Sequence, residues 1–275
     1  MCASLRGFSH PLSPEGRAQI VSPFPWHYSA ALIGINYKAD PAELRKLLPE
    51  PYQLSAIEPD GVSCWFLDWL FVGESDEEMI CVNPERAQYQ ECLLAIRCRV
   101  HGAEGLRCPY IWVDKDNAVL RGWFYGFPKK MGRIHLTFNK AHLYELNPGL
   151  GKVGPGTRFT AFCEAHGERL ITATIQLTRK ITAAELPPPF GLNWFNIVHF
   201  PSTDIDAGKP LVHQIVTNVV ESVRFGEAWA AEPESLVFTN SAVEEHTSLK
   251  PLEQTGAYYV TMGQTFKGTK IVHQY

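Results

Sequence analysis

The clearest pattern along this chain is a strict alternation of apolar and polar residues over positions 171–180, ITATIQLTRK. Apolar residues occupy the odd positions from Ile171 to Leu177, and threonine or glutamine occupies the even positions between them. A period of two puts alternate side chains on opposite faces, so this segment predicts a strand with one buried and one solvated face. The dipeptide His166-Gly167 just before it predicts a hairpin turn.

Similar short runs predict further strands, with little helix between them. Residues 40–51 predict one short helix, with Asp40 as the N-cap, Pro41 as its first residue and Pro49 as its stop. Many short strands and almost no helix indicate a mainly β (α+β) fold, a barrel or a sandwich, with a few short helices. We expect an N-terminal arm over 1–21 and a single domain over 22–275. The other predicted strands are 29–37, 62–72, 90–100, 109–114, 133–139, 193–200, 211–225 and 255–266.

Composition narrows the class of protein. Forty-five per cent apolar and twenty per cent charged residues are ordinary for a soluble globular protein. The net charge of -4, with no long basic run, argues against a nucleic-acid partner, and no window approaches the ~20 apolar residues of a membrane span. Seven cysteines without a C-x-x-C pair, after an N-terminus lacking an apolar signal core, predict reduced thiols and a cytoplasmic location.

A lysine pair, Lys129 and Lys130, follows the aromatic stretch WFYGFP at 123–128. An ordinary lysine amine, with a pKa near ~10.4, is protonated at neutral pH and cannot attack a carbonyl. Burial can lower a lysine pKa by up to ~3–5 units. A second ammonium ~7 Å away contributes ~2.4 kcal/mol at an effective dielectric of ~20, which lowers the pKa by a little under ~2 units. Desolvation is therefore the larger effect, and the apolar flanks favour it.

Other interpretations of the lysine pair remain open at this point. Neighbouring residues on a strand point to opposite faces, so Lys129 and Lys130 cannot share one pocket unless the chain turns. A solvated pair at a strand end, with one lysine snorkelling, is the alternative. The chain has no dinucleotide-binding, P-loop, zinc-protease or nucleophile-elbow motif, and its ten histidines show no metal-ligand spacing.

The segment GFPKKMG, residues 126–132, resembles the active-site segment of the acetoacetate decarboxylase family, whose [FY]-P-K-K core carries the Schiff-base lysine first. Further similar segments follow the family order, and the similarity extends from about residue 22 to 265. The resemblance implies an antiparallel β-barrel or cone and a homo-oligomer. It also implies Lys129 as nucleophile, Lys130 as its charged neighbour and Glu91 as a family glutamate, although Glu91 could instead point outward from a strand edge. The segments are SPFPWH, YKADPAELRKLLPEP, GLNWFNIVHFPSTDIDAGKPLV and GEAWAAEPESLVF.

The chain departs from this family at three places. The arginine that holds the substrate carboxylate falls on Ala30, and a second glutamate falls near Trp65, where Asp68 is the nearby acid. The usual G-R-E before the lysine motif is replaced by residues 121–123, RGW. A carboxylate buried without a cation is costly, which argues against small β-keto acids as substrates.

Together these features predict a Schiff-base lyase acting on a keto or aldehyde substrate through an iminium on Lys129. It would decarboxylate a β-keto acid or catalyse aldol and dehydration chemistry. Glu91 would move protons, with Tyr89, Tyr125 and Tyr258 as alternative donors, and neither a metal nor an organic cofactor would be needed. A non-catalytic barrel that binds an apolar small molecule is the alternative. The residues expected to contact the substrate are Phe127, Tyr125, Trp65 and Tyr89, and the wider aromatic candidates for the pocket add Trp69, Trp112 and Trp123.

Overall fold

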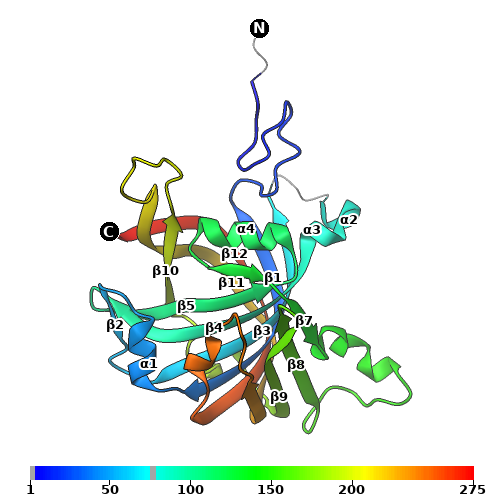
Figure 1. Cartoon of the computed structure of the whole chain (residues 1–275). Helices are drawn as coiled ribbons and strands as arrows, with labels where there is room; N and C mark the ends of the chain where they lie inside the picture. Colours follow the sequence, from blue (N-terminus) through cyan, green and yellow to red (C-terminus); the bar gives the residue numbers. More distant parts are fainter. Residues whose placement is uncertain (1–3, 75–78) are drawn as a thin grey trace.

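A closed ring of strands forms the centre of the molecule (Figure 1). The structure, a computed structural model, describes residues 4–74 and 79–275. Neighbouring ring strands are hydrogen-bonded, and the ring closes because one strand, β10, pairs with both β5 and β11. In order around the ring the strands are β10 (Asn193–Phe200), β5 (Ala103–Val113), β4 (Gln88–Val100), β3 (Gly61–Gly73), β1 (Trp26–Lys38), β12 (Glu253–Gln274) and β11 (Val212–Phe238).

Three further strands extend the sheet beyond β11, and two short strands pair with the ring. The extension runs through β9 (Glu168–Lys180), β8 (Arg158–Ala165) and β7 (Arg133–Leu136). Strand β2 (Tyr52–Leu54) pairs with β4, and β6 (Lys129–Met131) pairs with β5. The expected antiparallel, mainly β fold is confirmed as a cone-like ring, with parallel pairing only at β10–β5 and β5–β6 among the described strands.

Helices are few and short, as predicted, and they include several besides the one located from the sequence. In α1 (Pro41–Lys46), the Asp40 side chain accepts a 2.8 Å hydrogen bond from Ala42 N and Pro41 is the first residue, so the predicted cap is confirmed. The helix ends at Lys46, before the predicted stop at Pro49. The others are α2 (Met79–Val82), α3 (Pro84–Ala87), α4 (Asp116–Phe124) and the 3₁₀ turns η1 (Phe138–Leu146), η2 (Ala183–Glu185) and η3 (His246–Leu249).

Strand positions follow the sequence pattern better than strand lengths do. The predicted hairpin joins β8 to β9 at His166 (φ 55°) and Gly167 (φ 79°), the left-handed geometry of a tight two-residue turn. The strand predicted at 133–139 ends at Leu136, and η1 begins at Phe138. Strands β11 and β12 run for 27 and 22 residues, well past the predicted segments, and register shifts along their pairing bend them.

Two hydrophobic cores lie on opposite faces of the ring strands. On β1, Leu32 belongs to one core and its neighbour Ile33 to the other, as the period of two requires. The Ile33 core fills the space between the ring and the extension, with Phe159 and Ile175 packed from β8 and β9. The Leu32 core lies inside the ring and contains many aromatic side chains, among them Trp26, whose ring stacks on Phe266.

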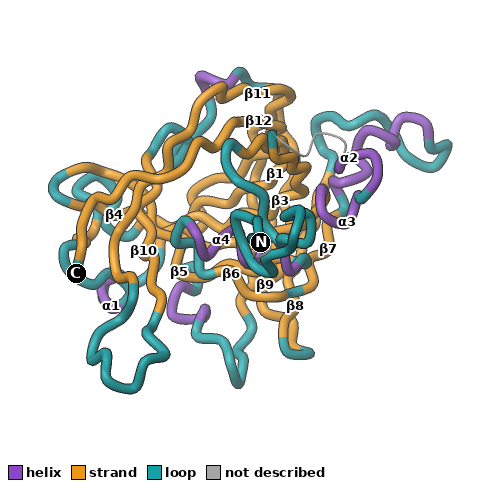
Figure 2. The backbone as a smooth tube through the Cα atoms, turned by 90° about the horizontal axis from the view of Figure 1, so that it is seen from above, coloured by secondary structure: helices purple, strands orange, loops and turns teal. Residues whose placement is uncertain are grey.

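The N-terminal segment packs against the ring before β1 begins. Ser9 Oγ accepts a 2.8 Å hydrogen bond from Val21 N, and the Phe8 ring meets Phe124 of α4 edge-on at 5.6 Å. Viewed from above, this segment and α4 lie over the middle of the strands (Figure 2). The boundary at residue 21 stays a prediction.

Of the seven cysteines, Cys2 lies outside the described residues. The six others are unbridged thiols; Cys81 is exposed and the remaining five are buried. Over 4–74 and 79–275, none of the helices has the length and apolar character needed to cross a membrane.

Candidate active site

A cavity of about 470 Å³ lies inside the ring. All seven ring strands contribute side chains to its wall, as does the segment 189–192 that leads into β10. Among the described lining residues, Glu91 and Lys129 are the two that carry charge, and most of the others are aromatic or aliphatic. The cavity is therefore a largely apolar chamber with one amine and one carboxylate.

Lys129 and Glu91 form a buried ion pair at this cavity. Lys129 Nζ lies 2.6 Å from Glu91 Oε2, and the two side chains are 2% and 4% exposed. Trp69 Nε1 donates a 3.1 Å hydrogen bond to the other carboxylate oxygen, Oε1, which fixes the carboxylate plane. The Lys129 ammonium also lies 5.0 Å from the centre of the Tyr89 ring. The carboxylate is close enough to exchange a proton directly with the lysine nitrogen.

Helix α4 shapes the space that Lys129 occupies. A Cβ on Gly122 would meet Lys129 Cγ and Cδ at 2.5 Å, so the lysine stem reaches the cavity only because residue 122 has no side chain. The Trp123 indole, 47% exposed, donates to the Lys129 carbonyl at 2.9 Å. Gly126 turns the chain between helix and strand at φ +82°, where a Cβ would also meet Asn196 Cβ at 2.9 Å.

Lys130 lies outside the cavity. Its ammonium pairs with Glu244, whose side chain is 1% exposed, while the Lys130 side chain is 44% exposed. Glu244 Oε1 also accepts a 3.1 Å hydrogen bond from Trp112 Nε1. The same oxygen lies 3.1 Å from His166 Nε2. Thus the structure brings Lys129 and Glu91 together and directs Lys130 to a separate cluster.

The four residues expected to contact substrate, namely Phe127, Tyr125, Trp65 and Tyr89, all line the cavity. Burial raises the pKa of Tyr89 well above its usual value, and the Glu91 carboxylate raises it further. Burial likewise raises the pKa of Tyr125. Both phenols therefore stay protonated at neutral pH and can donate hydrogen bonds but not serve as bases.

Other sequence candidates divide between the cavity and the rest of the protein. Trp69 lines the cavity, whereas Trp112 packs in the opposite core beside Glu244. The Tyr258 hydroxyl lies behind the wall and accepts a 2.6 Å hydrogen bond from Trp65 Nε1. Asp68 is outside the lining residues; burial raises its pKa, and the Asp114 carboxylate adds to the effect.

One buried cation near the cavity was not singled out as functional from the sequence. Ala30, at the position of the family arginine, is buried in the core inside the ring and supplies no charge. Arg121 of α4 is 1% exposed, stacks on Phe71 at 3.7 Å and lies 5.2 Å from the Tyr89 ring centre.

The Arg121 guanidinium Nε and Nη2 have no hydrogen-bond partner among the described residues. Its charge opposes the effect of burial on the pKa values of Tyr28, Tyr89 and Tyr125. Arg121 thus places a positive charge behind three tyrosines of the cavity wall. The signal in the sequence was the replacement of G-R-E by residues 121–123.

Within the described parts of the chain, histidine, cysteine and acidic side chains form no group of three placed to hold a metal ion.

Comparisons with known proteins find relatives that match nearly the whole chain. The family model for acetoacetate decarboxylase (ADC) matches residues 9–275. Acetoacetate decarboxylase 2 of Mesorhizobium japonicum is 27% identical over 269 residues, which cover 98% of this chain and 89% of that protein.

Two solved structures share both the fold and part of the sequence. The enduracididine biosynthesis enzyme MppR, complexed with the condensation product of pyruvate and imidazole 4-carboxaldehyde, superposes with a TM-score of 0.86 at 29% identity, covering 99% of this chain and 98% of MppR. An acetoacetate decarboxylase-like enzyme from Sphingomonas wittichii RW1 superposes with a TM-score of 0.88 at 25% identity, covering 98% and 100% of the two chains. The chain therefore belongs to the acetoacetate decarboxylase family and is an enzyme of that lyase or aldolase type.

Proposed function

We propose that this enzyme forms a Schiff base between Lys129 and a 2-oxo acid such as pyruvate, condenses it with an aldehyde and eliminates water. The observation that carries the proposal is the Lys129–Glu91 pair, buried at 2.6 Å on the wall of an apolar cavity. The amine needs a proton acceptor before it can attack a carbonyl, and Glu91 is within reach of its nitrogen.

The first half of the reaction prepares a carbon nucleophile. The Lys129 nitrogen adds to the ketone carbon to give a carbinolamine, and loss of the hydroxyl as water gives an iminium. The positive iminium acidifies the neighbouring methyl group, and Glu91 takes one of its protons to leave a neutral enamine. No metal or organic cofactor is required, because the iminium itself is the electron sink.

The second half joins the two substrates. The enamine carbon attacks the aldehyde carbon, and the proton that Glu91 took from the methyl group passes to the resulting alkoxide, either directly or through the hydroxyl of Tyr89 or Tyr125, so both phenols end protonated. Loss of a second α-proton together with the new hydroxyl releases water and leaves an unsaturated iminium. Hydrolysis then consumes one water and frees Lys129, so the net change is oxo acid plus aldehyde giving an unsaturated oxo acid plus water.

Cavity size favours condensation of two substrates over decarboxylation of acetoacetate alone. A volume of about 470 Å³ is large for one four-carbon acid. None of the described lining residues replaces the family arginine absent at Ala30, so the carboxylate of any oxo acid needs another partner. Tyr125 lies on the cavity wall with the Arg121 charge behind it, so its hydroxyl is the candidate donor to a substrate carboxylate. MppR, 29% identical, was solved with a pyruvate condensation product bound, which supports the same substrate class here.

Borohydride trapping tests the proposal. The protein is incubated with pyruvate and borohydride, and its intact mass and peptide map are measured. We expect a reduced pyruvate adduct on Lys129 that is absent from Lys129→Arg and still present in Lys130→Met. Adding an aldehyde without borohydride should yield an unsaturated oxo acid, visible by its absorbance. Carbon dioxide release from acetoacetate without condensation would favour the decarboxylase alternative, and binding of pyruvate without any adduct would contradict the Schiff base.

A further inference from the structure

One side of the cavity is built from the segment 189–194, which joins the connection after η2 to the first two residues of β10, Asn193 and Trp194. All six residues of this segment line the cavity. A hydrogen bond of 2.7 Å from Asn36 Nδ2 to the Pro188 carbonyl ties the segment to β1. The position of this part of the wall therefore depends on how the Asn36 amide is oriented.

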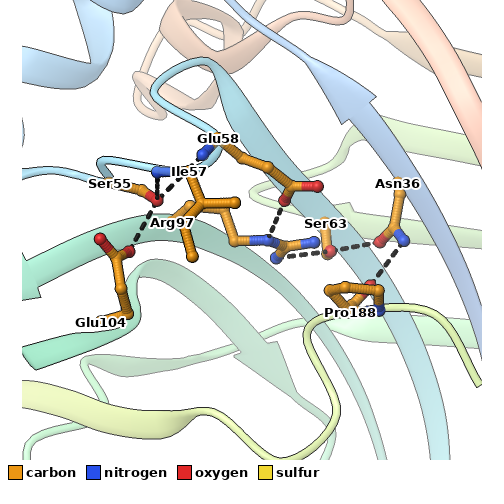
Figure 3. A network of polar contacts seen from close by, with 8 residues as sticks. All are labelled: Asn36, Ser55, Ile57, Glu58, Ser63, Arg97, Glu104 and Pro188. Carbon is orange, nitrogen blue, oxygen red and sulfur yellow. Dashed lines mark hydrogen bonds and ion pairs between the residues drawn. The ribbon is translucent and has the colours of Figure 1, made fainter.

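A chain of polar side chains fixes that orientation (Figure 3). The Arg97 side chain is 4% exposed; its Nε donates to Glu58 at 2.8 Å and its Nη1 donates to Ser63 Oγ at 3.1 Å. Ser63 Oγ in turn donates to Asn36 Oδ1 at 2.5 Å. A guanidinium has donors only, so Ser63 accepts from it and gives its own proton to Asn36 Oδ1. That arrangement leaves Asn36 Nδ2 facing the Pro188 carbonyl.

Beyond Pro188 the segment presents aromatic rings to the cavity. The Phe190 ring stacks on Trp65 at 5.6 Å with 15° between the planes, and it meets Phe225 edge-on at 5.7 Å. The Trp194 ring lies 5.7 Å from Trp65 and 5.0 Å from Phe127, two residues before Lys129. An aromatic surface thus runs from the segment to the reactive lysine.

We propose that Phe190, Trp194 and Trp65 form a subsite for an aromatic substituent on the aldehyde substrate, and that Asn36 is its positioning residue. The assignment of an aldehyde rests on the proposed function. Because these rings carry no charge and can stack or meet a ligand edge-on, they favour a flat apolar group over an aliphatic or charged one. Asn36 does not touch the substrate; it holds the segment that does.

The test uses Asn36→Asp, which has the same shape. Aspartate can still accept from Ser63 but cannot donate to Pro188, so the segment loses its tie. Asn147→Asp is the matched control, because it adds the same charge on an exposed loop where Asn147 Oδ1 serves only as an acceptor for Gly149 N. Benzyl alcohol binding is followed by tryptophan fluorescence, and KM is measured for benzaldehyde and for acetaldehyde in the presence of pyruvate.

For Asn36→Asp we expect the Kd of benzyl alcohol and the KM of benzaldehyde to rise roughly tenfold, the scale of one lost aromatic contact. The KM of acetaldehyde and the rate of pyruvate trapping should stay within about twofold, since neither needs the aromatic wall. Equal changes for both aldehydes, or none for either, would overturn the proposal.

Two further variants and one binding measurement keep the test decisive. Ser63→Ala interrupts the same relay if Asn36→Asp fails to fold, and Phe190→Leu removes the stacked ring directly. Both should weaken benzyl alcohol binding, and tight binding in both contradicts the subsite. If pyruvate is not trapped on the unaltered protein, the proposed function fails, while benzyl alcohol binding still decides whether the aromatic subsite exists.

Discussion

Lys129 and Lys130 are neighbours on the three-residue strand β6, and their ammonium groups leave it on opposite sides, one paired with Glu91 and the other with Glu244. This follows from strand geometry, in which successive side chains alternate between faces. Each ammonium group is therefore paired with its own carboxylate, one in the cavity wall and one outside it. In the proposed reaction, repulsion between the two ammonium groups is then a poor candidate for activating Lys129, which leaves burial and Glu91 as the candidates.

Lys130→Met tests this division. We expect the rate of pyruvate trapping on Lys129 to change by less than about threefold, because an exposed, paired charge acts weakly over distance. We expect the free energy of unfolding to fall by about 1–3 kcal/mol, since buried Glu244 loses a charged hydrogen-bond donor. Urea unfolding and borohydride trapping measure the two effects. A large loss of trapping in a variant of unchanged stability would restore Lys130 to the reaction.

Glu91→Gln tests the proton acceptor. Glutamine keeps an oxygen for the Trp69 hydrogen bond but cannot take the lysine proton or the substrate α-proton. We expect both imine formation and condensation to slow by about 10²–10⁴-fold, the usual range for a general base. Single-turnover trapping with pyruvate measures the first step, and hydrogen–deuterium exchange at the pyruvate methyl group measures the second. Unchanged methyl exchange would move the base to another residue.

Gly122→Ala tests the space that holds the lysine stem. The new methyl group would meet Lys129 Cγ and Cδ at 2.5 Å, and the stem cannot retreat easily because its amine is held at Glu91. We expect trapping to slow by about 10²-fold, the scale of a 1 Å misplacement of the amine. The steric clash should also lower the free energy of unfolding, although the better helix propensity of alanine offsets up to ~1 kcal/mol of that loss. Gly151→Ala is the matched control, because nothing lies within 4 Å of its added Cβ. Full activity in Gly122→Ala would show that the stem has room to move.

The sequence predicts the fold well where its pattern is periodic. Strict alternation over 171–180 marks β9, and Asp40 with Pro41 marks the start of α1, because both signals are local. Strands β11 and β12 were predicted too short, since glycines such as Gly226 and Gly268 interrupt the alternation where the strands bend. Helix α4 was missed because it contains Gly122 and has no side-chain cap, so its helical form depends on packing over the ring.

The two charged residues of the candidate site were predictable from the sequence, but the side chains that they contact were not. Motif resemblance pointed to Lys129 and Glu91, 38 positions apart, yet only the ring places their polar atoms at 2.6 Å. The Asn36 and Ser63 contacts, the Arg121 charge and the Glu244 cluster all join segments distant in sequence. No local periodicity encodes such contacts, which arise from how strands register around the ring.

Glu244 gives the last prediction, which concerns stability against pH. Burial alone would raise the pKa of Glu244, but hydrogen bonds from Lys130, Trp112 and His166 outweigh it and hold the pKa below the ordinary 4.5. A depressed folded-state pKa means that the unfolded chain binds this proton more readily. The contribution to stability is therefore complete above about 4.5 and is lost as pH falls through the folded-state value.

Glu244→Gln tests this contribution, because the carboxylates far from position 244 titrate alike in both proteins; Glu168, whose pKa the Glu244 charge raises, is the exception. We expect the variant to be less stable by about 1–3 kcal/mol at pH 7, as for a charged hydrogen bond lost from a buried site. The gap between the two proteins should narrow once the pH drops below about 4.5, and urea unfolding at pH 7, 5 and 4 measures it. A gap that stays constant over this range would mean that Glu244 is not held ionised by its three partners, and the cluster that directs Lys130 away from the cavity would need another explanation.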